Sequence, residues 1–246
     1  MDRFEHLKSA LENVKNEEAF MLEKIKKNVQ ASSYLTFLQN YLLLNALSET
    51  FLKNNYANAK QYFYTYGLVD EYLINKFDER TLDYGIDHLS YVLLSDNIHL
   101  IQRYADLSHS SYKPMVEKGH STPLYVLQRI MADDWDNVKR GIAIMDEKTL
   151  KKNKPLKPDR DFYESLLNKD ADSAKAAIYQ LLKDHKKRNK YKPLINEFIS
   201  TPALGYTKLA WLKGMELDID HPLVPKELLP FKPLDKYEVA YDFLKE

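Results

Sequence analysis

The sequence predicts an all-α protein in which helix pairs (αα-hairpins) stack into an array, as in TPR or HEAT repeats, with a proline-containing capping segment at the C-terminal end. Apolar residues recur at three-to-four spacing over most of the chain, whereas alternating runs of β-branched residues bounded by turn pairs are missing. A helix-turn-helix pattern also recurs four times, at intervals of 36 to 42 residues. Such intervals are typical of helix-pair repeats, which stack because one pair cannot bury its own apolar face.

The N-terminal part is expected to be helical. Apolar residues between Phe4 and Lys27 keep the spacing of one helical face. Residues 33–53 are more apolar, which predicts a central helix of the fold.

Four segments, starting at Leu52, Leu94, Met131 and Leu167, carry the recurring pattern. The first position is apolar, and the fourth is a residue type that favours the N-cap of a helix: Asn55, Asn97, Asp134 and Asp170. The eighth and twelfth positions are apolar and share one helical face: Ala59 and Phe63, Ile101 and Ala105, Val138 and Ile142, Ala174 and Ile178. Each segment is therefore predicted to end one helix, form a capped turn and begin the next.

Helix-turn-helix joints look alike in any all-α protein, so an unrepeated helical fold is the alternative. Two stretches interrupt the array: residues 107–123 are loop-like, and residues 146–158 form a basic, proline-marked linker that could be a hinge or an insertion. We expect one domain over residues 1–246, with a possible subdivision into N-terminal helices at 1–107 and C-terminal helix pairs with the tail at 120–246.

Composition argues against several classes of protein. The 36 basic and 36 acidic side chains balance, whereas a general nucleic-acid binder is usually basic. The chain has no cysteine, which excludes disulfides and thiolate chemistry. It has neither a signal-peptide pattern at Met1 nor an apolar run of about 18 residues, so we expect a cytoplasmic protein without a membrane partner.

No motif in the sequence indicates catalysis. The seven histidines form no helical ligand pair, and His88 and His99 are expected at helix caps or on the surface. The acidic run at 132–137 falls on a predicted capped turn, where Asp134 and Asp136 favour the helix start. We therefore expect no catalytic residues, no cofactor and no metal. The basic run at 183–192 suits the C-terminal end of a helix, although contact with phosphate is an open alternative.

An acidic, tyrosine-rich stretch is the candidate partner-binding surface. Between residues 64 and 106, eight acidic residues stand against three basic ones. Tyrosine supplies contact area and carboxylates steer association with a basic protein, although solvated helix faces explain the same charges equally well. The candidate residues are Tyr66, Asp70, Glu71, Tyr72, Asp78, Glu79, Asp83 and Asp87.

The C-terminal part carries a family resemblance. In residues 197–244, a helix around Tyr206-Thr-Lys208-Leu-Ala-Trp211 leads through Lys213-Gly214 into an acidic link. His221-Pro222-Leu-Val-Pro225, Glu227-Leu-Leu-Pro230, Pro233-Leu234 and Tyr237 follow. These elements, together with the helix pair at 166–188, resemble immunity protein family 49 of bacterial polymorphic toxin systems. The signature is structural rather than catalytic. Gly214 suits a left-handed helix C-cap, and Pro225 suits the start of a short helix.

The resemblance implies a non-enzymatic protein that binds a cognate toxin domain, encoded by an adjacent gene, and thereby protects the producing cell and its kin. A nuclease is one possible kind of toxin, since an acidic face would suit a basic nuclease groove. Two other functions are open: a helical-repeat scaffold or adaptor for peptide segments or a folded partner, and an enzyme or nucleic-acid protein built on the histidines or the basic run.

Overall fold

The computed structural model describes residues 2–78, 82, 85–188 and 193–245, and all regular structure in these ranges is helical. The all-α helix-pair array is therefore confirmed. The principal helices are α1 (Arg3–Val14), α2 (Glu17–Lys26), α3 (Ala31–Phe51), α4 (Tyr56–Phe77), α5 (Gly85–Leu94), α6 (Ile98–Tyr104), α7 (Tyr112–Glu117), α8 (Thr122–Met131), α9 (Trp135–Ile144), α11 (Lys157–Asn168), α12 (Ala171–Lys183), α13 (His185–Arg188), α14 (Pro193–Asn196) and α15 (Thr201–Leu212). Short turns of helix lie at Met145–Thr149, α10 (Leu150–Lys152), Lys154–Leu156, Lys226–Leu228 and Asp242–Leu244.

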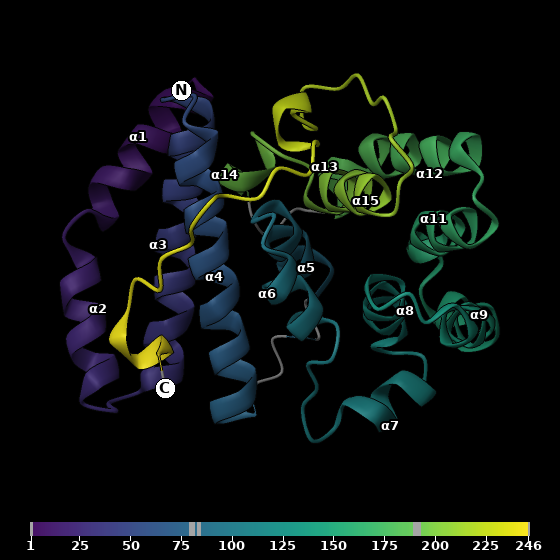
Figure 1. The fold of residues 1–246 in the computed structure, drawn as a ribbon, viewed down its shortest axis with the longest axis horizontal. Coiled ribbons are helices and arrows are strands. Elements are labelled where there is room, and N and C mark those ends of the chain that lie inside the picture. Colours follow the sequence, from purple (N-terminus) through teal and green to yellow (C-terminus); the bar gives the residue numbers. More distant parts are fainter. Residues whose placement is uncertain (1, 79–81, 83–84, 189–192, 246) are drawn as a thin grey trace.

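From α1 to α9 the helices follow one another along the long axis of the molecule, and the helices after α9 turn back over its middle (Figure 1). Helices α1 and α2 cover α3, which pairs with α4, and α4 packs on α5. At the far end, α8 pairs with α9, α9 packs on α11, and α11 pairs with α12. The predicted central helix at 33–53 is α3, which is buried on several sides because its apolar residues surround its axis.

The four predicted joints are present with one shared geometry. The fourth residue of each segment caps the next helix by accepting a hydrogen bond from the backbone N–H three residues on: Asn55 (3.2 Å), Asn97 (2.8 Å), Asp134 (3.3 Å) and Asp170 (3.0 Å). The residue before each cap has a left-handed backbone, with φ between 51° and 57°: Asn54, Asp96, Asp133 and Lys169. All residues at the eighth and twelfth positions are buried. The same local backbone geometry therefore ends one helix and begins the next at each of the four joints.

The two predicted interruptions are more helical than expected. Residues 107–123 contain α7, so the expectation of a loop there was only partly right. Residues 146–158 form a series of short helical turns from α9 to α11, which is interrupted at Asn153 and includes a π-helical turn at Met145–Thr149. The prolines of this stretch lie in first turns of helix, where a missing backbone N–H breaks no helical hydrogen bond.

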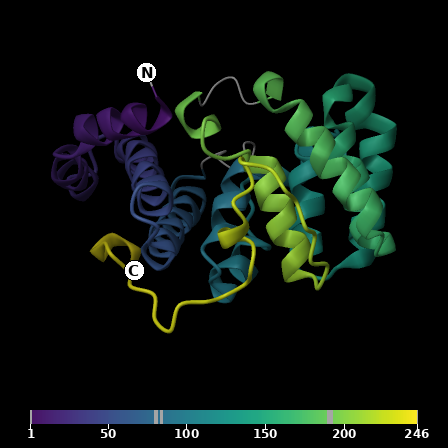
Figure 2. The same ribbon diagram turned by 90° about the horizontal axis from the view of Figure 1, so that it is seen from above.

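Helix α15 occupies a central place, although it is the last long helix in the sequence. It packs on α5 and on α12, and Figure 2 shows its yellow-green ribbon between the two halves. Gly205 permits the contact with α5, because a Cβ at this position would lie 2.0 Å from Oγ of Ser90. Helix α15 thus joins the two halves of the array and does not extend the array by another helix pair.

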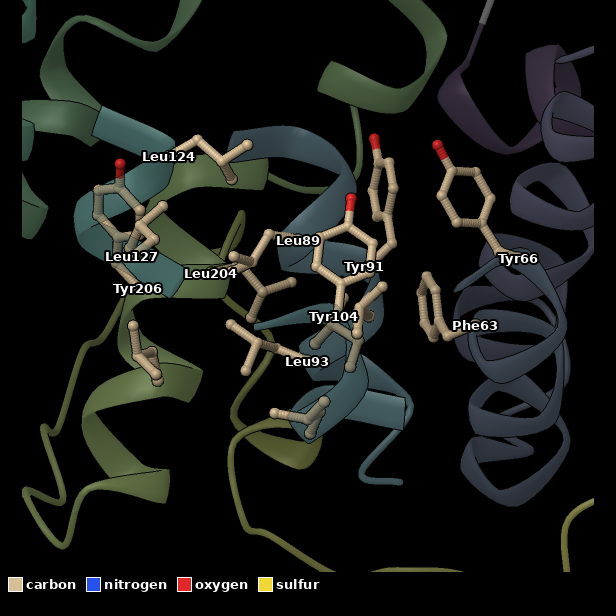
Figure 3. Packing of buried hydrophobic residues seen from close by; sticks show 14 of the residues in the cluster. Phe63, Tyr66, Leu89, Tyr91, Leu93, Tyr104, Leu124, Leu127, Leu204 and Tyr206 are labelled. Atoms are coloured by element: carbon tan, nitrogen blue, oxygen red, sulfur yellow. The ribbon is translucent and has the colours of Figure 1, made fainter. Parts of the chain in front are cut away.

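Buried rings and leucines fill the space around α5 (Figure 3). Phe63 and Tyr66 of α4 face Tyr91, while leucines of α5, α8 and α15 meet on its other side. Four tyrosines, at positions 91, 104, 163 and 206, have no exposed surface. The buried cluster extends continuously from Leu7 to Tyr241, which favours the predicted single domain, although that organisation stays a prediction.

The C-terminal tail reaches further than a terminal cap would. Gly214 ends α15 with φ +79°, as predicted, and Pro225 precedes the turn at Lys226–Leu228. The tail then runs back over α4 towards α2, as its yellow trace in Figure 1 shows. Tyr237 donates a hydrogen bond to the Ser95 carbonyl (2.7 Å), and Tyr241 donates one to Glu18 (2.7 Å).

A buried ion cluster fastens the tail to the array. Asp96, with no exposed surface, pairs with Lys208 of α15 (2.5 Å) and Lys60 of α4 (2.7 Å). The two ammonium groups also donate to tail carbonyls: Lys60 to residue 232 (2.7 Å), and Lys208 to residues 228 (2.8 Å) and 230 (2.9 Å). Burial lowers the pKa of Lys208 to about 8, against the raising effect of Asp96. Tail, α4 and α15 are therefore held by one carboxylate.

Substituting Asn55 with alanine should lower the free energy of unfolding by about 1 kcal/mol, because the first turn of α4 loses the acceptor for one unpaired N–H. Asn55→Asp is the matched control, since aspartate caps equally well and its charge favours the helix start. Chemical denaturation measures both. A loss of equal size in the two variants would contradict the capping role.

Lys208 should make stability depend on pH between about 8 and its ordinary value of 10.5. The folded state holds this proton less tightly than the unfolded state does, so the contribution of Lys208 to stability is lost as pH falls through the folded pKa and is complete above 10.5. Raising the pH from 8 to 10 should therefore stabilise the wild type relative to Lys208→Met, by at most about 1.4 kcal/mol per pH unit. Denaturant unfolding of both proteins across this range measures the difference, and a constant difference would contradict the depressed pKa.

Candidate functional site

The predicted acidic surface is partly interior. Tyr66 and Asp70 are only 3% and 0% exposed, so their assignment to a partner-binding surface was wrong. Both lie on the face of α4 that α3 and α5 cover, in line with the buried residues Phe63 and Leu73. That face continues the three-to-four spacing of core positions, which places Asp70 inside in spite of its charge.

Asp70 is a junction between four helices. Its carboxylate contacts Nδ1 of His88 on α5 (3.0 Å) and accepts hydrogen bonds from Tyr104 on α6 (2.6 Å) and Gln39 on α3 (2.9 Å). Burial by itself raises the pKa of Asp70, but the charge of His88 and these hydrogen bonds outweigh it and hold the pKa below its usual value. The expectation that His88 caps a helix or lies on the surface was wrong, whereas His99 is exposed.

The other candidate residues of this stretch are largely engaged within the chain. Glu71 accepts hydrogen bonds from Nε and Nη2 of Arg103 (2.7 and 2.9 Å), and the Tyr72 ring packs edge-on against Phe243. Asp78 is exposed and accepts hydrogen bonds from the backbone N–H (2.7 Å) and hydroxyl (2.5 Å) of Ser110. Asp87 is half-buried, and Glu79 and Asp83 lie outside the described residues. A contact of these residues with a partner stays a prediction.

The basic run at 183–192 is tied to another buried carboxylate, Asp159. Arg188 pairs with Asp159 of α11 (2.8 Å), which also accepts a hydrogen bond from Tyr206 of α15 (2.7 Å). Burial raises the pKa of Asp159 in spite of the opposing charge of Arg188. The run thus begins at the end of α12, as predicted, and Asp159 joins its arginine on α13 to α11 and α15. Residues 189–192 are outside the described ranges.

The acidic segments at 132–137 and 218–220 lie in a capped turn and in a link, as the sequence indicates. Asp134 caps α9 and Asp136 lies in its first turn. Asp218 and Asp220 are exposed in the link after α15 and lie 3.2 and 3.5 Å from Lys226. Over the part of the chain that the structure describes, no three His, Asp or Glu side chains come together as metal ligands, and no helix is both long and apolar enough to cross a membrane.

A surface groove lies where two of the capped joints meet the end of α15. We call it the Trp135 groove; its volume is about 910 Å³. Half-buried Trp135, Leu167 and Met215 form its apolar part, and Lys139 and Lys169 are exposed at its edge. Sequence reasoning did not identify it, because its third wall comes from α15. One signal was available: the fifth position of the recurring segment is tryptophan only at Trp135.

Substitutions at the adjacent carboxylates Asp70 and Glu71 should distinguish a buried structural role from that of a surface ion pair. Asp70→Ala should lower the free energy of unfolding by about 3 kcal/mol or more, because it leaves buried His88, Tyr104 and Gln39 groups without their acceptor. Glu71→Ala, which removes a surface ion pair one position along, should cost about 1 kcal/mol or less. Denaturant unfolding compares the two. Equal losses would contradict the structural role of Asp70.

Comparison with known proteins identifies the family. The sequence profile of the family described as Immunity protein 49 matches residues 76–228. The matched segment runs from the end of α4 to the short turn of the tail, which is more than half of the chain. No curated protein and no solved structure matches the chain. The match agrees with the resemblance noted in the C-terminal sequence, and the chain belongs to the Immunity protein 49 family.

Proposed function

We propose that this protein neutralises a cognate bacterial toxin domain by forming a tight protein–protein complex, and so protects the producing cell and its kin. The membership of residues 76–228 in the Immunity protein 49 family carries this proposal. The protein acts in the cytoplasm as a binder without catalytic activity of its own. The toxin is encoded by an adjacent gene, and binding blocks its active site or locks its conformation; a nuclease is one class of toxin that fits.

The physical character of the array supports a binding role. Stacked helix pairs expose an extended surface, and buried Asp70, Asp96 and Asp159 each connect several elements. A surface held in one conformation before binding loses less conformational entropy when the complex forms. Affinity therefore arises from contacts across a large preformed surface rather than from the folding of a flexible segment.

Co-expression in a bacterium tests the function. The domain encoded by the neighbouring gene should arrest growth alone, and the wild-type protein should restore growth and co-purify with that domain. Gly205→Val is the control, because a side chain there collides with Ser90 and disrupts the packing of α15 on α5. The control should give neither rescue nor complex. A toxic domain that the wild type neither binds nor neutralises would refute the proposal and favour a peptide-binding adaptor instead.

A further inference from the structure

The Trp135 groove combines apolar side chains with exposed positive charge. Its walls come from the joint before α9, the joint after α11 and the end of α15. The lining residues all fall within 76–228, the segment that matches the family. A second exposed apolar patch, at Phe20 and Phe37, lies outside that segment. The groove is therefore the stronger candidate for a surface that serves the family's function.

The apolar part of the groove is suited to hold one inserted side chain. Trp135 is the first residue of α9, directly after the N-cap Asp134. Leu167 comes from α11 and Met215 from the segment after α15, and buried Leu166 also lines the groove. No described residue accepts a hydrogen bond from the indole N–H of Trp135. Tryptophan in such a setting combines a large contact area with a free donor, as residues that dominate binding energy often do.

The charge of the groove is uncompensated. Lys213 is satisfied internally by Asp133 (2.7 Å) and the Met131 carbonyl (3.1 Å). Lys139 and Lys169 are exposed, and neither forms an ion pair or a side-chain hydrogen bond with any residue of the described ranges. Two positive charges thus stand beside apolar side chains, and Asp133, the one carboxylate among the described residues that line the groove, is already paired with Lys213.

We propose that the Trp135 groove receives an acidic segment of the toxin domain, which places an apolar side chain against Trp135 and carboxylates beside Lys139 and Lys169. This inference rests on the proposed function. Opposite charges at the edge of an interface steer association, and a desolvated tryptophan at its centre slows dissociation. A protein segment fits better than a nucleic acid, because two lysines neutralise too few phosphates for a chain whose net charge is zero.

The test is binding of the purified toxin domain, made with an inactivating substitution, to the double variant Lys139→Glu/Lys169→Glu. Both side chains are exposed and unpaired, so the variant should fold as the wild type does. Affinity should fall about tenfold or more, mainly through slower association at low salt. Lys151→Glu/Lys152→Glu is the matched control: the same change in charge lies on exposed residues beyond the other end of α9 and should leave affinity unchanged.

Trp135→Ala provides a second measurement, in which dissociation should become faster while the charge of the groove is intact. Circular dichroism and thermal unfolding establish that each variant is folded, and if Trp135→Ala is not, the lysine variant alone decides. Unchanged affinity of the folded lysine variant overturns the inference and leaves the proposed function standing. Failure of the wild type to bind the toxin domain refutes the function, and the groove inference with it. Binding of a single-stranded oligonucleotide that is lost only in the lysine variant would also overturn it.

Discussion

The shape of this molecule depends on a carboxylate with no access to water. Asp96 lies in the second capped joint, where its backbone takes the left-handed conformation that ends α5. Removing an ion from water costs several kcal/mol, and only close partners with well-placed hydrogen bonds offset that cost. Lys208 and Lys60 supply the opposite charge, and their remaining protons satisfy carbonyls of the tail. A residue that shapes a local turn therefore also fixes which distant helix and which tail segment pack beside it.

Three carboxylates of the described residues have no exposed surface, namely Asp70, Asp96 and Asp159, and each serves a different part of the fold. Asp70 joins α3 to α6, Asp96 brings in α15 and the tail, and Asp159 connects α11 with α13 and α15. Leucines and tyrosines fill the volume between helices without fixing one relative position, whereas hydrogen bonds to a carboxylate are directional. The apolar core thus supplies cohesion, and the buried charges select the arrangement in which groove and surface residues are presented.

The local features of the fold could be predicted from the sequence, and the long-range ones could not. Asn55 and Asp170 were recognised as caps because capping depends on residue type and on a backbone N–H only three positions away. The interior place of Asp70 had a signal, since Phe63, Tyr66 and Leu73 continue the same helical face, but charge was given more weight than periodicity. The sequence carried no signal for the packing of α15 beside α5, because this packing depends on the fit between Gly205 and Ser90, which are more than a hundred residues apart. For the same reason, a groove with walls from three segments could not be predicted.

The central place of α15 bears on how the protein is made. A ribosome releases the chain from its N-terminus, so the face of α5 that receives Gly205 remains open until the last fifth of the chain has emerged. Asp96 likewise lacks its partner Lys208 until that part of the chain has emerged. The groove lacks the wall that contains Met215 for the same time. The nascent protein consequently cannot assemble its core step by step along the array, as an open solenoid can. Completion of the fold, and of the surface that would meet a toxin, therefore requires synthesis to have passed Met215.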